Sequence, residues 1–265
     1  MISIQDLHVT FGEGTPLETK ALKGINFTIE AGEFVTVIGS NGSGKSTLLN
    51  SLSGEVKPKN GSIKIDNKDI TQWSVNKRAS LIARVFQDPL IGSCANLSIE
   101  ENMALAWNRG ENAIFSMALD SGKREVFKKQ LSRLGLGLED RLGDSMGLLS
   151  GGQRQAVSLL MSSLKPAKML LLDEHTAALD PKTAAYVIDL TSEIITDNQL
   201  TTLMVTHSMQ QALDVGTRTI MLHEGKIVFD VQGEERSKLG VTDLLELFKQ
   251  KHHGEALSDD SLLLS

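Results

Sequence analysis

The sequence predicts an α/β fold, because β-rich segments alternate with segments of helical spacing. Residues 34–38 form an apolar, β-rich run that stops at Gly39, and residues 47–52 then have helical spacing. The β-formers return at residues 169–172 and again at residues 203–206. A strand, a glycine-rich turn and a helix in succession are typical of the first unit of such a fold.

Two further groups of segments add to this α/β core. Between about residues 88 and 148 the pattern becomes helical: Ser98 and Glu101 match a capping box, and residues 123–134 place apolar side chains at helical spacing. Because β-rich segments resume after this stretch, we expect it to be an insertion in the core. Three other runs of β-formers predict a small antiparallel layer: residues 2–9, 25–29 and 62–65.

The last third of the chain predicts a closing hairpin and one more helix. Residues 220–222 and 226–229 are β-rich and flank Gly225. Residues 241–249 have helical spacing. The final residues, 252–265, are polar and acidic, and we expect them to form a loose tail.

Composition limits the class of protein. The chain has 265 residues, of which 40% are hydrophobic, and this suits one globular unit or one core with a lobe. No apolar run approaches the roughly 18 residues that a membrane-spanning helix needs. The first residues, MISIQDL, lack a basic segment followed by an apolar one, so we expect no secretory signal.

Charge and cysteine content narrow the class further. The formal net charge of −6 argues against a broad basic surface, and we therefore expect no nucleic-acid partner. Cys94 is the single cysteine, which excludes an intramolecular disulfide and fits a reducing cytoplasm. We expect its side chain to be buried or partly buried.

A glycine-rich loop at residues 39–46, GSNGSGKS, predicts a phosphate site. Backbone N–H groups can turn inward around a phosphate only where side chains stay clear, and the helix that follows points its positive end at the same place. Lys45 would neutralise the β- and γ-phosphate oxygens, and the Ser46 hydroxyl would ligate Mg²⁺. The predicted nucleotide-binding residues are Gly39, Ser40, Asn41, Gly42, Ser43, Gly44, Lys45, Ser46 and Thr47.

An acidic pair follows a second apolar run, in the sequence MLLLDE at residues 169–174. Asp173 would end a buried strand, where a carboxylate is costly unless a cation compensates it. A magnesium ion, reached directly or through water, would do so. Glu174 comes next, so on a continuing strand its side chain would leave from the opposite face.

Residues 149–153, LSGGQ, predict a second helix start that suits a phosphate. Ser150, Gly151 and Gly152 would begin this helix, and the segment has no lysine. The alternative is an ordinary helix cap that happens to contain glycines.

Five segments in this order resemble the ATP-binding cassette (ABC) ATPases, and the resemblance covers nearly the whole chain. In order they are GSNGSGKS, the glutamine Gln87 after a strand-like run, LSGGQ, MLLLDE, and the histidine His207 that ends TLMVTH. The resemblance implies a P-loop NTPase core with an antiparallel β subdomain and an inserted α-helical subdomain. It also implies ATP and Mg²⁺ as cofactors, and ATP hydrolysis as the activity.

The resemblance implies a single ABC ATPase domain over residues 1–265. Its core and antiparallel layer would comprise residues 1–87 and 164–251. The helical subdomain with the signature segment would comprise residues 88–163.

The resemblance also implies roles for single residues. Glu174 would be the general base that polarises the attacking water, and His207 would contact the γ-phosphate. Gln87 would reach the metal or the attacking water, and it would join the core to the helical subdomain. The implied metal set is therefore Ser46, Gln87 and Asp173. Taken alone, His207 and Gln87 would count as ordinary polar residues.

A head-to-tail dimer is a further implication. Its signature segment, Ser150, Gly151, Gly152 and Gln153, would cover the γ-phosphate held by the other subunit, so that two ATP molecules are buried at one interface. Phe11 would stack on adenine. Asp180 would lie at the dimer seam, and it also fits a helix N-cap before Pro181; both interpretations can hold together.

Spacing and length exclude several kinds of ABC protein. Ser46 and Asp173 are 127 residues apart, which leaves no room for the coiled coil of the chromosome and repair members. The translation factors carry two cassettes, and many exporters carry fused membrane helices. What remains is a cytoplasmic ATPase subunit, peripheral on the inner face of the cell membrane through a separate permease that docks near Gln87.

The stretches RVFQDPL and LSIEENMALA resemble ATPases of bacterial importers fed by an extracytoplasmic solute-binding protein, with amino acids or related small molecules as solutes. In DEHTAALDP, His175 stands where proline is commoner, a variant that resembles importers of aromatic or similar amino acids. Two alternatives stay open. One is an efflux or lipid-extracting complex, and the other is a non-transport assembly ATPase. The sequence of this subunit does not specify the solute.

Overall fold

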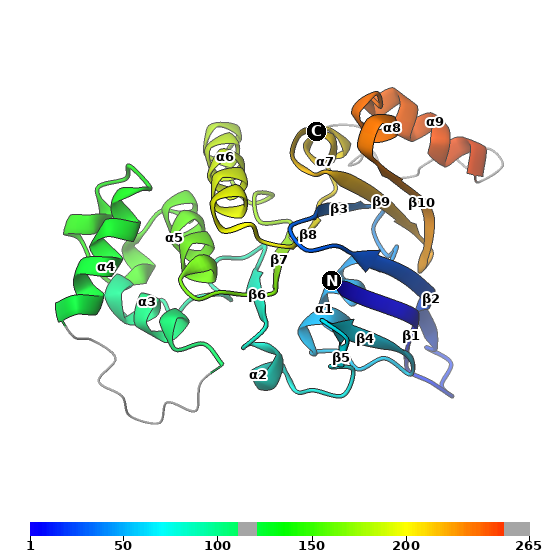
Figure 1. Ribbon diagram of the computed structural model, residues 1–265, viewed down its shortest axis with the longest axis horizontal. Helices are drawn as coiled ribbons and strands as arrows, with labels where there is room; N and C mark the ends of the chain where they lie inside the picture. Colours follow the sequence, from blue (N-terminus) through cyan, green and yellow to red (C-terminus); the bar gives the residue numbers. More distant parts are fainter. Residues whose placement is uncertain (111–120, 252–265) are drawn as a thin grey trace. The chain divides into compact units, whose positions relative to one another are not determined.

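The computed structural model describes residues 1–110 and 121–251, and the chain divides into two compact units (Figure 1). The first unit comprises residues Met1–Arg78 and Thr201–Ser265, and the second comprises Ala79–Leu200. The predicted loose tail, residues 252–265, lies outside the described residues.

An antiparallel sheet in the first unit confirms the predicted N-terminal layer. Its strand order is β2-β1-β4-β5, and β1 pairs antiparallel with both β2 and β4. The apolar residues Ile2, Ile4, Leu7 and Val9 of β1 are buried, as expected for a sheet with one face on the core. The strands are β1 (Ile2–Phe11), β2 (Thr19–Ile29), β4 (Asn60–Ile65) and β5 (Lys68–Asp69).

The other strands of the first unit are largely parallel. Strand β3 (Phe34–Ile38) pairs parallel with β8 (Thr202–Val205) on one side and with β9 (Arg218–His223) on the other. Every residue of β3 and β8 is buried, as expected for a strand covered on both faces. Strand β10 (Lys226–Gln232) pairs antiparallel with β9, which confirms the predicted hairpin.

Five helices belong to the described part of the first unit: α1 (Lys45–Ser53), α2 (Val75–Arg78), α7 (Met209–Val215), α8 (Gly233–Ser237) and α9 (Val241–Lys251). Helix α1 confirms the helix predicted after the glycine-rich loop, and α9 confirms the last predicted helix. Ile38, Met209, Phe229 and Leu244 form one buried apolar cluster, which packs α7 and α9 against the end of β3 and against β10.

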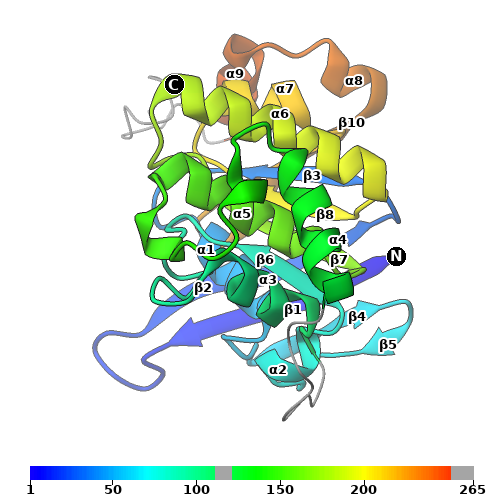
Figure 2. The same cartoon turned by 90° about the vertical axis from the view of Figure 1, so that its left-hand side faces the viewer.

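The second unit contains a parallel strand pair and four α-helices among its described residues. Strand β6 (Ile82–Val85) pairs parallel with β7 (Met169–Asp173). Figure 2 shows α5 and α6 side by side, and the two helices are in contact. The helices are α3 (Ile99–Trp107), α4 (Ser121–Ser132), α5 (Gly151–Ser163) and α6 (Pro181–Asn198).

Two local features of the second unit match the predictions, the capping box of α3 and the burial of apolar residues of α4. Ser98 and Glu101 form the predicted capping box at the start of α3. Phe127 and Leu131 of α4 are fully buried, and the Phe127 ring meets Trp107 edge-on at a centroid distance of 6.0 Å. The unit boundaries, however, differ from the proposed 88–163 insertion, whose limits stay a prediction.

Over residues 1–110 and 121–251, no helix is both long enough and apolar enough to cross a membrane.

Arg78 is a fully buried arginine that supports the helix after the glycine-rich loop. Its Nη1 donates to the carbonyls of Ser51 at 2.6 Å and Leu52 at 2.7 Å, in the last turn of α1. Its Nη2 donates to the Thr71 carbonyl at 2.7 Å. The last carbonyls of a helix have no partner within it, so Arg78 satisfies groups that would otherwise be buried without a hydrogen bond.

We expect Arg78→Ala to lower the free energy of unfolding by about 3 kcal/mol, because three buried carbonyls lose their donor. Urea unfolding measures this change. Arg124→Ala is the control, since Arg124 is exposed and pairs with Glu100 at 3.1 Å; its effect should stay within about 0.5 kcal/mol. Equal effects of the two substitutions would contradict this role of Arg78.

Candidate functional site

The glycine-rich loop runs from the end of β3 to the start of α1 and has a backbone that only glycine fits. Gly39 has φ 149° and Gly44 has φ 106°. A Cβ on Gly39 would lie 2.2 Å from the Leu222 carbonyl oxygen, and one on Gly44 would lie 2.7 Å from the Ala21 carbonyl oxygen. The loop is therefore fixed by its neighbours and by the conformation that its glycines permit.

Two polar side chains of this loop, those of Ser43 and Lys45, are buried. The Lys45 side chain is only 5% exposed, and its Nζ donates to the carbonyls of Gly39 at 2.6 Å and Ser40 at 3.1 Å. Ser43 Oγ is buried and makes no hydrogen bond with the described residues. Ser46 is exposed in the first turn of α1. A cationic group, a buried hydroxyl in need of a partner and a helix N-terminus fit a phosphate group.

His207 follows β8 at the same edge of the sheet as the glycine-rich loop. The Thr206 N–H donates to the Val37 carbonyl at 3.1 Å, which ties the end of β8 to the end of β3. Ser208 then caps α7, its Oγ accepting from the Gln211 N–H at 3.1 Å. Because parallel strands end at the same edge, the first unit brings His207 and the loop together.

Phe11 is the last residue of β1 and is 45% exposed. An exposed aromatic ring is available for stacking on a planar ligand.

In the second unit, Asp173 ends β7 as predicted, and it has a protein cation beside it. Arg84 of β6 places its Nη2 2.7 Å from Asp173 Oδ2, and both side chains are largely buried. The register pairs Arg84 with Leu171, so the arginine reaches the strand end from the neighbouring strand. This partner was not predicted from the sequence; the available signal was an arginine inside the otherwise apolar strand IARV.

The direction of the Glu174 side chain does not follow from strand alternation. Strand β7 ends at Asp173, and Glu174 has φ 42°, in the left-handed region that non-glycine residues rarely adopt. The chain turns here, and the Ala177 N–H donates to the Glu174 carbonyl at 2.9 Å. Glu174 is partly buried, and the turn rather than strand alternation sets its direction.

The signature segment starts α5 with a full capping box. Ser150 Oγ accepts from the Gln153 N–H at 3.3 Å, and Gln153 Oε1 accepts from the Ser150 N–H at 3.1 Å. Ser150 and Gly151 are exposed. The helix-cap interpretation is thus confirmed, and the exposed N-terminus also leaves room for an anion.

Gly152 packs this helix start closely against α6. A Cβ on Gly152 would lie 2.1 Å from Thr183 Cγ2. Asp180 is the N-cap of α6, directly before Pro181. Its Oδ1 accepts from the Thr183 N–H at 3.1 Å. Hydrogen bonding from the side chain and the backbone of Thr183 lowers the pKa of Asp180. The second unit therefore brings the signature segment and Asp180 together.

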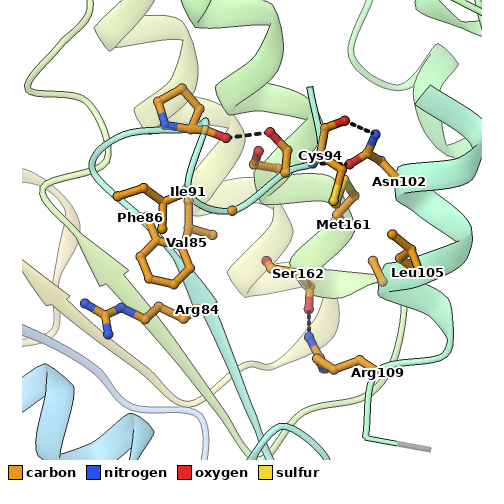
Figure 3. Close-up of a pocket in the computed structure, with 15 residues that line it drawn as sticks. Arg84, Val85, Phe86, Ile91, Cys94, Asn102, Leu105, Arg109, Met161 and Ser162 are labelled. Atoms are coloured by element: carbon orange, nitrogen blue, oxygen red, sulfur yellow. Dashed lines mark hydrogen bonds between the residues drawn. The ribbon is translucent and has the colours of Figure 1, made fainter. Parts of the chain in front are cut away.

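Gln87 is exposed two residues after β6, beside a cavity of about 320 Å³ (Figure 3). Figure 3 shows Val85 and Phe86 of the strand end facing Leu105 and Met161 across this cavity. Its walls are the end of β6, the loop of residues 89–94, and helices α3 and α5. Gln155 of α5 donates from Nε2 to the Phe86 carbonyl at 3.2 Å, so the signature helix also holds the segment that leads to Gln87.

Asn102 shapes the loop at the cavity rim. It is buried on α3, its Oδ1 accepts from the Cys94 N–H at 2.7 Å, and its Nδ2 donates to the Cys94 carbonyl at 3.0 Å. These bonds hold the backbone of Cys94, and this residue lines the cavity. Cys94 is exposed, and the expectation of a buried cysteine is wrong.

The predicted site residues thus fall into two groups, one in each unit. Phe11, the loop of residues 39–47 and His207 belong to the first unit, and the others belong to the second. In the described part of the chain, no cluster of three His, Cys, Asp or Glu side chains could hold a metal ion by itself.

Residues 22–177 match the family model described as "ABC transporter". The chain belongs to the ABC transporter ATP-binding family. It is 44% identical over 249 residues to a tyrosine transport ATP-binding protein of Clostridioides difficile, covering 94% of this chain and 99% of that protein. It is 34% identical to a thiamine import ATP-binding protein of Salmonella choleraesuis, covering 78% of this chain and 83% of that protein.

A solved structure is also similar over most of the chain. It is a dimeric post-hydrolysis state of an ATP-binding cassette bound to ADP and Pi, with a TM-score of 0.74 and 29% identity, covering 88% of this chain and 98% of that one. The fold is therefore the P-loop NTPase fold of ABC cassettes, as predicted. The protein is an ATP-binding ABC ATPase.

We expect Asp180→Ala to lower the melting temperature by roughly 2–4 °C, because the N-terminus of α6 loses its cap. Asp180→Asn keeps a capping oxygen and should change the melting temperature by less than about 1 °C. Differential scanning calorimetry on the two variants measures the difference. An equal loss in both would mean that the carboxylate acts through its charge rather than as a cap.

Proposed function

We propose that this protein is the motor subunit of an importer, in which two copies bury two ATP molecules with Mg²⁺ and drive a separate membrane permease. The observation that carries the proposal is the presence of two helix N-termini suited to phosphate. One is at α1 and has Lys45 beside it, and the other is at α5 and has no lysine. Binding of a nucleotide by a single subunit would need only the N-terminus of α1.

The loop before α1 would bind the nucleotide phosphates. Backbone N–H groups of the loop, the Lys45 ammonium and the positive end of α1 would balance the negative charge of the phosphates. Phe11 would stack on the adenine ring, and His207, at the same sheet edge as the loop, would contact the γ-phosphate.

Hydrolysis would use the residues that follow β7. The Glu174 carboxylate would take a proton from the attacking water, and Gln87 would orient that water or the metal. The Ser46 hydroxyl and the Asp173 carboxylate would hold Mg²⁺, which supplies positive charge to the phosphate oxygens. Arg84 would keep Asp173 in place through the 2.7 Å contact.

The signature segment would act on the ATP of the partner subunit. Ser150 and Gly151 are exposed at the N-terminus of α5, where backbone N–H groups can meet a γ-phosphate. Asp180, close to this segment through Thr183, would lie at the same dimer seam. ATP binding would therefore close the dimer, and hydrolysis would reopen it.

The permease would dock at the cavity beside Gln87. This cavity is bounded by the loop of residues 89–94, and large apolar side chains stand exposed around it: Leu90, Ile91 and Leu105. Such a concave apolar surface suits an amphipathic helix of a partner. Through this contact the subunit would sit on the cytoplasmic face of the cell membrane.

Import is favoured over the two alternatives by the relatives' names. The protein from Clostridioides difficile, similar along almost its whole length, is named for tyrosine transport, and the one from Salmonella choleraesuis is named for thiamine import. We propose an aromatic amino acid such as tyrosine as the solute, delivered by an extracytoplasmic solute-binding protein. An efflux motor and an assembly ATPase have no comparable support.

We expect Lys45→Ala to weaken ATP binding by about tenfold or more, because a buried charged donor to the phosphates is lost. Equilibrium titration with a fluorescent ATP analogue measures the affinity. Lys57→Ala removes an exposed lysine outside the loop and is the control. Unchanged affinity in Lys45→Ala would count against the proposed phosphate site.

We expect Glu174→Gln to bind ATP but to lose hydrolysis by at least about a hundredfold, because the general base is gone. Light scattering should then find a monomer without nucleotide and a dimer with Mg-ATP. Near-normal ATP turnover by this variant would contradict the assignment of Glu174 as the base. A monomer under both conditions, with ATP binding measured separately, would speak against closure of the dimer by ATP alone.

A further inference from the structure

The turn that contains Glu174 must be held in place by contacts with other residues. Its φ of 42° is unfavourable for a residue with a side chain, so the surrounding structure must hold it. One side of the turn is held at Asp173 by Arg84, at 2.7 Å. The other side is held by the residue that follows Glu174.

That residue, His175, is buried and bonded to α6. It is 2% exposed, and its Nε2 lies 2.9 Å from the Oγ1 of Thr191, which is itself buried. Thr191 Oγ1 donates its hydrogen to the Val187 carbonyl at 2.7 Å, one turn earlier in α6. Because the hydroxyl hydrogen is used there, the imidazole must carry the hydrogen on Nε2 and donate it to Thr191.

The environment of His175 agrees with this direction of the hydrogen bond. Burial lowers the pKa of His175 to about 4, so the ring is neutral near pH 7. A neutral imidazole has one N–H, and here Thr191 Oγ1 is placed to accept it. Two hydrogen bonds in series therefore connect the residue after Glu174 to the backbone of α6.

We propose that His175 is a positioning residue, whose hydrogen bond to Thr191 fixes the Glu174 turn against α6 and thereby aims the Glu174 carboxylate. The proposal rests on the proposed role of Glu174 as the general base. Such a base must lie within hydrogen-bond reach of the water that it activates, so a small shift of the turn costs rate. Binding of ATP by the glycine-rich loop would not depend on this contact.

Four variants test the contact with matched controls. Thr191→Val removes the acceptor at nearly constant volume, and Thr191→Ser keeps it. His175→Leu removes the donor, and His175→Gln keeps an N–H near the same place. The measurements on each full-length protein are kcat and KM for ATP, hydrogen exchange of the backbone amides of residues 174–180, and the melting temperature.

We expect Thr191→Val and His175→Leu to lower kcat by about ten- to a hundredfold, with KM for ATP unchanged within about twofold. The Ala177 amide, which donates to the Glu174 carbonyl, should exchange about tenfold faster. Thr191→Ser and His175→Gln should keep kcat within about threefold of the natural protein.

Two results would overturn the inference. One is a kcat of Thr191→Val within about twofold of the natural protein while Glu174→Gln is inactive; the proposed function would then stand. The other is faster hydrogen exchange throughout the second unit together with an equal loss of kcat in all four variants. That result would assign His175 a purely structural role. Normal turnover of Glu174→Gln would instead overturn the proposed function itself.

Discussion

Burial of whole strands is the constraint on which the site depends. Strands β3 and β8 have no exposed residue, and the first four residues of β7 are buried as well. Such strands can carry only apolar or internally bonded side chains, so polar chemistry must begin where each strand stops. The glycine-rich loop follows β3, Asp173 and Glu174 stand at the end of β7, and His207 follows β8 by two residues.

Each of these strand ends then needs a turn with a particular backbone and something to hold it. Glycines permit the loop after β3, and the Leu222 and Ala21 carbonyls leave no space for a side chain there. The turn after β7 contains no glycine. It relies on side chains, with Arg84 on Asp173 before the turn and Thr191 on His175 within it. Helix α6 therefore supports the candidate base, and its first turn also contacts the signature helix at Gly152.

The sequence predicted what local patterns determine. The loop of residues 39–46, the capping box at Ser98 and the hairpin around Gly225 all follow from residue types within a few positions of one another. Long-range contacts were not predictable in this way. Arg84 and Asp173 are 89 residues apart, and His175 meets Thr191 across 16 residues, so neither pair is visible before the fold is known.

Two departures from local rules have the same origin. Strand alternation would send the Glu174 side chain to the face opposite Asp173, but the chain turns at Glu174, whose φ is 42°, and tertiary contacts hold this turn. Residue type predicted a buried Cys94, but Asn102 of α3 holds the loop backbone at this residue, and Cys94 is exposed. Where the structure departs from local rules, side chains from other elements decide the outcome.

The central claim is that the signature segment of one subunit meets the glycine-rich loop of another when ATP is bound. A cross-linking measurement tests it directly, in a Cys94→Ser, Glu174→Gln background. Asn41→Cys, in the exposed part of the loop, is mixed with Leu148→Cys, in the exposed turn before the signature segment, and a short bismaleimide is added. We predict a cross-linked dimer that forms only with Mg-ATP. Cross-linking that is absent, or equal without nucleotide, would contradict the account.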